Sequence, residues 1–294
     1  MNQRPDLDQL GLGTGKKARL HRILHGHGLR NGTAIFLPYD QGLEHGPRDF
    51  FANPAASDPR YILKLALEGG FNGIAIQIGL AEKFYWDYAG EIPLVLKLNG
   101  KTDIPASADP LSPVNATVAD AVRLGADAVG YTLYVGSPGQ ERDFEQYRQV
   151  REDAQRLGMP LIVWAYPRGE AIDAKGGKDS FYAVDYAART ASELGADVVK
   201  VNFPHPEKHY GAYARELSSQ QAIDAVVRSA NRTLLLVSGG ERAGDEAMLE
   251  KARESMEAGA TGLIFGRNVW QREHGESLSF AAQLRDVMAK YSSA

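Results

Sequence analysis

The sequence predicts an α/β protein that folds as a (β/α)8 TIM barrel, a single domain with an N-terminal helical extension. The chain has 294 residues, and a barrel of this class typically needs about 250. One unit recurs along it, in which a helical stretch ends in glycine and an apolar run follows at once. Eight apolar runs alternate with helical patterns, which favours a closed parallel barrel over an open sheet.

The N-terminal extension, residues 1–32, comes first. It contains KKARLHRILHGHG, in which Leu20, Ile23 and Leu24 recur at helical spacing. This helix is expected to pack under the barrel or against another subunit. The barrel is expected to span residues 33–294, because no linker or low-complexity tract divides them.

The eight strands are expected to be buried on both faces, since the runs are almost continuously apolar. They lie in the segments 33–40, 73–79, 94–100, 124–136, 157–169, 194–204, 233–240 and 258–268. The glycine before several of these runs suits the left-handed end of a helix. The turn after the first strand reads PYDQGLEHGP, which is not the G-x-G-x-x-G turn of a doubly wound dinucleotide-binding sheet.

The composition narrows the possible partners. The chain has 33 basic and 37 acidic residues, a net charge of −4 and no block of like charge, so neither a nucleic acid nor a membrane is an expected partner. Cysteine is absent, which excludes disulfides, a thiolate nucleophile and zinc–cysteine sites. No signal peptide or membrane span is predicted, and we expect a cytoplasmic protein.

Polar side chains are predicted to converge at one end of the barrel, because catalytic groups of such barrels lie at the C-terminal ends of the strands. Alternate residues of a strand share a face. In ADVVKVNFP, residues 196–204, Val198, Lys200 and Asn202 therefore share the inward face. The inward or strand-end residues of the other strands are Asp40, Gln41, Glu44, His45, Gln77, Lys97, Asn99, Trp164, Tyr166 and Arg168.

Two glycine-containing motifs at the ends of the last two strands predict a phosphate site. The seventh strand ends in Ser238, Gly239 and Gly240, and the eighth is followed by Gly266 and Arg267. Loops after these strands often bind phosphate in barrels, because glycines let backbone N–H groups approach the anion and a nearby helix N-terminus adds its dipole. The arginine would add a bidentate charged contact.

This set of residues fits Schiff-base chemistry on a phosphorylated keto sugar, as in an aldolase. Burial depresses the pKa of a lysine, and the neutral amine attacks a ketone to form an imine that acts as an electron sink. Lys97 in the same mouth would push Lys200 further toward the neutral form. Tyr166 would carry the proton of the reacting hydroxyl, and Asp40 would orient the amine or the substrate.

Each of these residues also has a purely structural interpretation. Lys200 could form a buried salt bridge with Asp40 or Glu44. Tyr166 and Trp164 could simply pack, as aromatic residues at strand ends usually do. Asp40 could be a turn residue, and the sequence SGG could be no more than a tight turn.

Histidine offers a competing hypothesis, the metal site of a metal-dependent aldolase. It would use His205 and His209 with His45. Prolines at 204 and 206 break any regular spacing, so positions in a solvated loop are favoured. We expect neither a metal nor another cofactor.

Seven blocks of the chain resemble, in order, those of the archaeal-type class I fructose-1,6-bisphosphate aldolases, a Schiff-base-forming (β/α)8 barrel family. They are LPYDQGLEHGP (37–47), LVLKLNGKT (94–102), AVGYTLYVGS (128–137), VWAYPRG (163–169), ADVVKVNF (196–203), SGG (238–240) and GRNVWQR (266–272). The resemblance implies reversible cleavage of fructose 1,6-bisphosphate, a glycolytic and gluconeogenic sugar phosphate, to dihydroxyacetone phosphate and glyceraldehyde 3-phosphate.

The resemblance also implies roles for individual residues. Lys200 would be the Schiff-base lysine and Tyr166 the general acid/base, while Asp40 would assist imine chemistry. The phosphate nearest the ketone would be held by Ser238, Gly239, Gly240, Gly266 and Arg267. Trp164 would shape the substrate channel, and the other substrate-binding residues would be Lys97, Arg168 and His45.

Family members assemble as decamers of two stacked pentamers, so the resemblance implies a homo-oligomer. Residues 171–180, AIDAKGGKDS, show no clear family pattern, which leaves the contacts to the distal phosphate open. The alternatives are a sibling Schiff-base synthase or transaldolase-type enzyme on another phosphorylated sugar, a metal-dependent aldolase, and a phosphosugar-binding protein without turnover.

Overall fold

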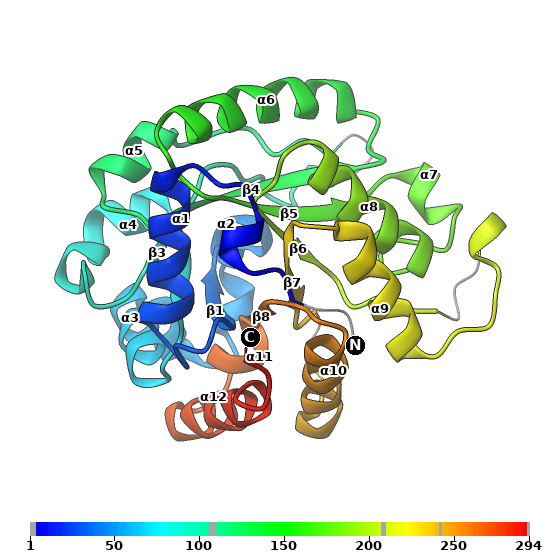
Figure 1. Ribbon diagram of the computed structural model, residues 1–294. Helices are drawn as coiled ribbons and strands as arrows, with labels where there is room; N and C mark the ends of the chain where they lie inside the picture. Colours follow the sequence, from blue (N-terminus) through cyan, green and yellow to red (C-terminus); the bar gives the residue numbers. More distant parts are fainter. Residues whose placement is uncertain (1–3, 106–109, 207–209, 241–242, 293–294) are drawn as a thin grey trace.

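The computed structural model (Figure 1) describes residues 4–105, 110–206, 210–240 and 243–292. Within them, eight parallel strands close into a barrel in chain order, and the last strand pairs with the first. They are β1 (Ala34–Tyr39), β2 (Gly73–Gln77), β3 (Leu94–Lys97), β4 (Ala128–Val135), β5 (Leu161–Pro167), β6 (Val198–Val201), β7 (Leu234–Ser238) and β8 (Gly262–Ile264). The predicted (β/α)8 barrel is confirmed.

Helices surround the barrel (Figure 1). They are α1 (Thr14–His21), α2 (Gln41–His45), α3 (Pro59–Glu68), α4 (Ile78–Phe84), α5 (Val118–Arg123), α6 (Gln140–Arg156), α7 (Glu170–Asp173), α8 (Phe181–Glu193), α9 (Ser219–Ala230), α10 (Asp245–Glu257), α11 (Arg267–Trp270) and α12 (His274–Met288). No helix in the described part of the chain is long and apolar enough to span a membrane.

Local sequence sets the ends of these helices. Ser218 and Gln221 form a reciprocal capping box that starts α9, which satisfies backbone donors that the first helical turn leaves free. After α8, Gly195 has a φ of +93°, a conformation that favours glycine. The chain then enters β6 three residues later, as the repeated helix, glycine and strand unit predicts.

Side chains of each strand alternate between two apolar cores. On β6, Val198 packs inside the barrel, with residues such as Phe36 and Leu236. Val199 and Val201 pack outside it, between the sheet and the helices. The predicted division of β6 into an inward and an outward face is therefore correct.

The N-terminal extension closes the N-terminal end of the barrel. Leu20, Ile23 and Leu24 join the core inside the barrel. Lys16 pairs at 2.7 Å with Asp197, the residue that precedes β6. Of the two placements that the sequence allowed for this helix, the structure shows packing under the barrel.

Candidate active site

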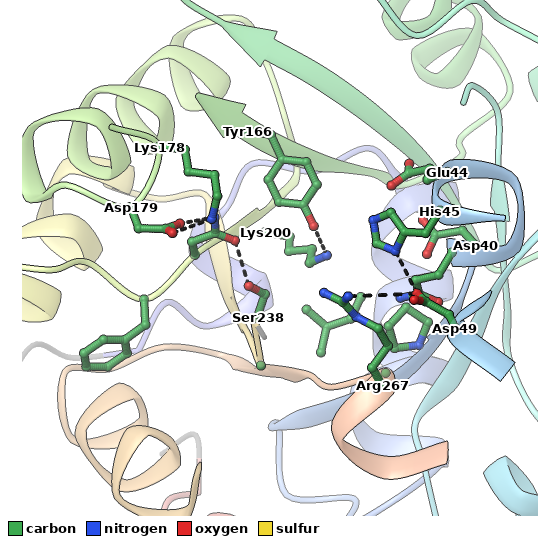
Figure 2. A pocket seen from close by; sticks show the side chains of 18 of the residues that line it. Asp40, Glu44, His45, Asp49, Tyr166, Lys178, Asp179, Lys200, Ser238 and Arg267 are labelled. Atoms are coloured by element: carbon green, nitrogen blue, oxygen red, sulfur yellow. Dashed lines mark hydrogen bonds and ion pairs between the residues drawn. The ribbon is translucent and has the colours of Figure 1, made fainter. Parts of the chain in front are cut away.

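A pocket of about 700 Å³ opens at the C-terminal ends of the strands (Figure 2). Of the twelve residues predicted to act in catalysis or substrate binding, ten line it: Asp40, His45, Tyr166, Arg168, Lys200, Ser238, Gly239, Gly240, Gly266 and Arg267. Gln41, Glu44 and Asn202, which were predicted to lie at this end of the barrel, line it as well. These residues are far apart in sequence, and the closed barrel brings them together because their strands all end at the same rim. Figure 2 shows Lys200 between Lys178 and Asp179 on one side and His45, Asp49 and Arg267 on the other.

Lys200 and Tyr166 meet at the centre of the pocket. Lys200 projects from the inward face of β6, is 5% exposed, and donates a hydrogen bond from Nζ to the Tyr166 hydroxyl. β5 and β6 are adjacent, and Trp164 stands opposite Lys200 in the register. Tyr166 lies two residues further along β5, so its side chain leans over the same mouth.

Burial changes the pKa values of Lys200 and Tyr166 in directions that favour proton transfer. It lowers the pKa of Lys200 to about 8, and the charges of Lys97 and Arg267 add to this effect while Asp40 and Glu44 oppose it. At pH 7 about one tenth of the amine is then neutral. Burial also raises the pKa of Tyr166 well above its ordinary value, so the phenol keeps its proton and can donate it.

Two predicted residues, Lys97 and Trp164, are not among those that line the pocket. Lys97 is fully buried at the end of β3 and donates to Thr132 Oγ1 at 2.7 Å and to the Asn99 carbonyl at 3.2 Å. The Trp164 ring centroid lies 5.2 Å from Lys97 Nζ and 5.3 Å from Lys200 Nζ. The geometry favours an electrostatic role for Lys97 over the substrate contact that the resemblance implied, because its ammonium is buried and already hydrogen-bonded.

Two carboxylates share the ammonium of Lys97. Its Nζ lies 3.6 Å from Asp40 and 3.8 Å from Glu44. The buried salt bridge that was the structural alternative for Lys200 is therefore made by the neighbouring lysine. Burial raises the pKa of Glu44, and the charge of Asp40 raises it further while Lys97 lowers it.

The sequence interpretation placed Glu44 at this end of the barrel but assigned it no catalytic or substrate-binding role. Glu44 lines the pocket, and its Oε1 has no hydrogen-bond partner among the described residues. α2 begins directly after Asp40 and carries Glu44 in its first turn. The spacing of four residues between Asp40 and Glu44 could have indicated such a role, because one helical turn brings the second carboxylate back to the same side as the first.

The predicted phosphate end of the pocket is held by a chain of hydrogen bonds. Ser238 Oγ donates to Asn202 Oδ1 at 2.9 Å, and Asn202 Nδ2 donates to Asp179 Oδ1 at 2.6 Å. Asp179 also pairs with Lys178. Lys178 and Asp179 belong to the segment 171–180, which sequence reasoning could not interpret, and both line the pocket.

The opposite side of the pocket carries His45 and Arg267 around one carboxylate. His45 Nδ1 lies 2.7 Å from Asp49 Oδ2, and Arg267 Nη1 lies 3.9 Å from the same oxygen. Arg168 stands apart from them, over the rings of Tyr134 and Tyr166 at 5.9 Å and 5.2 Å. Cationic groups thus occupy several parts of the pocket rim.

The histidines considered for a metal site do not form one cluster in the described part of the chain. His45 and His205 both line the pocket, and His209 lies outside the described residues. The residues that the structure describes include no group of three or more His, Asp or Glu side chains placed to hold a metal ion.

The fold and the site define a barrel aldolase that works through a lysine, and a comparison with known families agrees. The model of the DeoC/LacD family aldolases matches residues 34–272. The fructose-bisphosphate aldolase class 1 of Thermoproteus tenax is 41% identical over 260 residues, 88% of this chain and 90% of the relative. This chain belongs to the class 1 fructose-bisphosphate aldolases, as the resemblance of its seven blocks implied.

Two further relatives bear on the chemistry. A solved structure of an archaeal fructose-1,6-bisphosphate aldolase holds the carbinolamine intermediate of its substrate covalently on the catalytic lysine. It matches with a TM-score of 0.80 and 39% identity, and the match covers 92% of this chain and 99% of that one. The fructose-bisphosphate aldolase/6-deoxy-5-ketofructose 1-phosphate synthase of Methanocaldococcus jannaschii is 33% identical over 253 residues, 83% of this chain and 77% of the relative.

Proposed function

We propose that this chain cleaves fructose 1,6-bisphosphate reversibly to dihydroxyacetone phosphate and glyceraldehyde 3-phosphate through a Schiff base on Lys200. The observation that carries the proposal is the contact between the buried amine of Lys200 and the hydroxyl of Tyr166 at the centre of the pocket. The covalent lysine intermediate of the archaeal relative supports it.

The reaction begins on the neutral amine of Lys200, which attacks the C2 carbonyl of the ketose. Tyr166 donates its phenolic proton to the hydroxyl of the resulting carbinolamine, which leaves as water, and the positive nitrogen of the iminium then withdraws the electron pair of the C3–C4 bond. The Tyr166 phenolate accepts the proton of the C4 hydroxyl as that bond breaks, and glyceraldehyde 3-phosphate leaves. Tyr166 returns this proton to C3 of the enamine, and a water molecule then adds to the iminium, gives a proton back to Tyr166 and releases dihydroxyacetone phosphate and the free amine.

Charged groups around the lysine support the cationic intermediate. Asp40 and Glu44 favour a positive charge on the Lys200 nitrogen, and they would do the same for the iminium. The phosphate nearest the ketone would bind at Ser238, Gly239, Gly240, Gly266 and Arg267. Arg168 and His45 line the same pocket and would bind the rest of the substrate.

Borohydride trapping in the presence of dihydroxyacetone phosphate tests the proposal. We expect loss of activity and a mass adduct on the peptide that contains Lys200, and neither adduct nor turnover in Lys200→Met. Lys64→Met removes an exposed lysine on α3 that pairs with Glu68, and this control should form the adduct as the parent does. Inactivation by a chelator without any adduct would instead favour a metal-dependent aldolase, and binding of the sugar without turnover would favour a phosphosugar-binding protein.

A sibling synthase activity is the second candidate. The double name of the Methanocaldococcus jannaschii relative favours it, since that protein is both an aldolase and a 6-deoxy-5-ketofructose 1-phosphate synthase. A product assay separates the two candidates. The enzyme would be offered fructose 1,6-bisphosphate alone and then with a second, non-phosphorylated aldehyde, and a new ketose phosphate formed only in the second case would establish the synthase.

We also propose that the chain forms a homo-oligomer, which the family resemblance implies as a decamer. Phe51, Trp86 and Ile104 support this proposal, because they are 76%, 68% and 87% exposed although they are large and apolar. Single scattered apolar residues are common on monomers, so sedimentation velocity at micromolar concentration is the decisive measurement. A single monomeric species would contradict the proposal.

A further inference from the structure

We infer that Lys251, in α10, binds the phosphate nearest the ketone alongside Gly239 and Gly240. The inference rests on the proposed function, because it requires a phosphorylated ketose in this pocket. The sequence gives no signal for it, since Lys251 lies in the middle of an amphipathic helix, thirteen residues after Ser238. Only the fold brings its ammonium to the strand ends.

The ammonium of Lys251 lies against the two glycines that follow β7. Its Nζ donates a long hydrogen bond of 3.4 Å to the Gly239 carbonyl. It also lies 3.9 Å from the position that a Cβ on Gly240 would occupy. Lys251, Gly239 and Gly240 all line the pocket, so an anion on the glycine backbone would be within reach of this ammonium.

The charged groups around Lys251 do not neutralise its ammonium, so this ammonium can still attract an anion. Lys251 is half-buried and forms no ion pair with a described residue. The carboxylate of Asp179 acts on it electrostatically, but that carboxylate is already bound to Lys178 and Asn202. The face of Phe203, 5.7 Å away, is a weak partner by comparison.

A bound anion stabilises the ammonium of Lys251 more than it stabilises a cation that is already paired with a carboxylate. Burial lowers the pKa of Lys251, which reflects the cost of holding its charge away from water. Lys97 and Lys178 each have a carboxylate within 4 Å. Lys251 therefore has an interaction to gain that Lys97 and Lys178 have already made.

The position of Lys251 favours the proximal phosphate over the distal one. Barrels bind phosphate at the loops after the last two strands, and Lys251 contacts the first of these loops. Arg267 stands at the second, as the first residue of α11 after β8. A phosphate between the two loops would meet one cation from each, which matches its charge of about −2.

The test compares Lys251→Met with the parent in borohydride trapping at Lys200. Dihydroxyacetone phosphate carries only the proximal phosphate, and dihydroxyacetone carries none. We expect the half-saturating concentration of dihydroxyacetone phosphate to rise about tenfold or more, as for loss of a charge-assisted contact. The half-saturating concentration of dihydroxyacetone should stay unchanged. In Lys251→Arg, most of the affinity for dihydroxyacetone phosphate should be retained.

Arg253→Met is the matched control, because this residue lies two positions along the same helix, is exposed and pairs with Glu250. It should bind dihydroxyacetone phosphate as the parent does. Thermal unfolding of each variant checks the fold, and Lys251→Gln replaces the methionine variant if that one is unstable.

Three results would overturn the inference. They are unchanged affinity for dihydroxyacetone phosphate, an equal loss for dihydroxyacetone, and a loss confined to fructose 1,6-bisphosphate, which would place Lys251 at the distal phosphate. If the parent traps no adduct at all, the proposed function fails instead. Calorimetric titration with inorganic phosphate then tests Lys251 separately, and equal binding by parent and variant would refute its role.

Discussion

Replacing Lys97 by methionine is expected to shift the pH dependence of catalysis toward alkaline pH. The buried ammonium of Lys97 disfavours a second positive charge on Lys200 and so contributes to the lowered pKa of that amine. Methionine keeps much of the side-chain length and removes the charge. Without it, Lys200 holds its proton to a higher pH, and less of the nucleophilic amine is present at neutral pH.

The structure sets the size of this effect. Both ammonium groups lie just over 5 Å from the Trp164 ring centroid, so the two nitrogens are at most about 10 Å apart. At that separation like charges repel by about 1.7 kcal/mol at an effective dielectric constant of about 20, which is a lower limit. That energy corresponds to roughly 1.2 pKa units. The pKa of Lys200 should rise from about 8 to roughly 9, and the neutral fraction at pH 7 should fall about tenfold.

The assay is the rate of adduct formation with saturating dihydroxyacetone phosphate, measured from about pH 6 to about pH 10. The variant should be about tenfold slower at pH 7 and should approach the rate of the parent roughly one unit higher. Lys64→Met should follow the parent throughout. An unshifted profile with weaker binding of fructose 1,6-bisphosphate would refute the reasoning and favour direct substrate contact, and an equal loss at every pH would indicate a structural role only.

Two further predictions concern the proton carrier and the barrel itself. Tyr166→Phe should slow cleavage about 100-fold or more while imine trapping falls far less, because water can supply the proton that imine formation needs, and cleavage at the parental rate would rule out Tyr166 as the acid/base. Gly262→Ala would place a Cβ in direct overlap with the Ala34 carbonyl oxygen of the neighbouring strand, with the carbonyl carbon 2.7 Å away, and should destabilise the fold by about 3 kcal/mol or more. Gly79→Ala, which meets open space, is its control in thermal unfolding at fixed protein concentration, and equal melting of the two variants would contradict the close approach of β1 and β8.

The sequence was sufficient to predict the barrel because strands buried on both faces are short and apolar, and helices that cover them are amphipathic. Alternation then assigned the faces of β6, where Lys200 points inward and Val199 outward. The strand ends were less predictable. The segment 258–268 contains only a three-residue strand, β8 (Gly262–Ile264), because the register with β1 and β7 determines how far it pairs.

Alternation predicts the face of a residue but not its depth in the barrel. Lys97 and Lys200 both point inward, yet Lys200 lines the pocket and Lys97 does not. The difference comes from the stagger between β3 and β6, which is a property of the closed barrel and not of either strand. Lys178 and Lys251 were missed for a related reason, since a loop and a helix carry them to the rim and no local pattern marks that approach.

The charges around Lys200 satisfy two opposing demands of Schiff-base chemistry. The amine must lose its proton to attack a ketone, and the iminium that follows is a cation in the same place. Asp40 and Glu44 stabilise a positive charge on this nitrogen, in the ammonium and in the iminium alike, whereas burial and Lys97 destabilise it. Carboxylates alone would keep Lys200 protonated, and Lys97 alone would free the amine but penalise the iminium. The ammonium of Lys97 lies 3.6 Å and 3.8 Å from these two carboxylates and partly offsets their charge. A positive charge on the Lys200 nitrogen is therefore neither strongly stabilised nor strongly destabilised. This role accounts for a fully buried lysine at a position outside the substrate pocket.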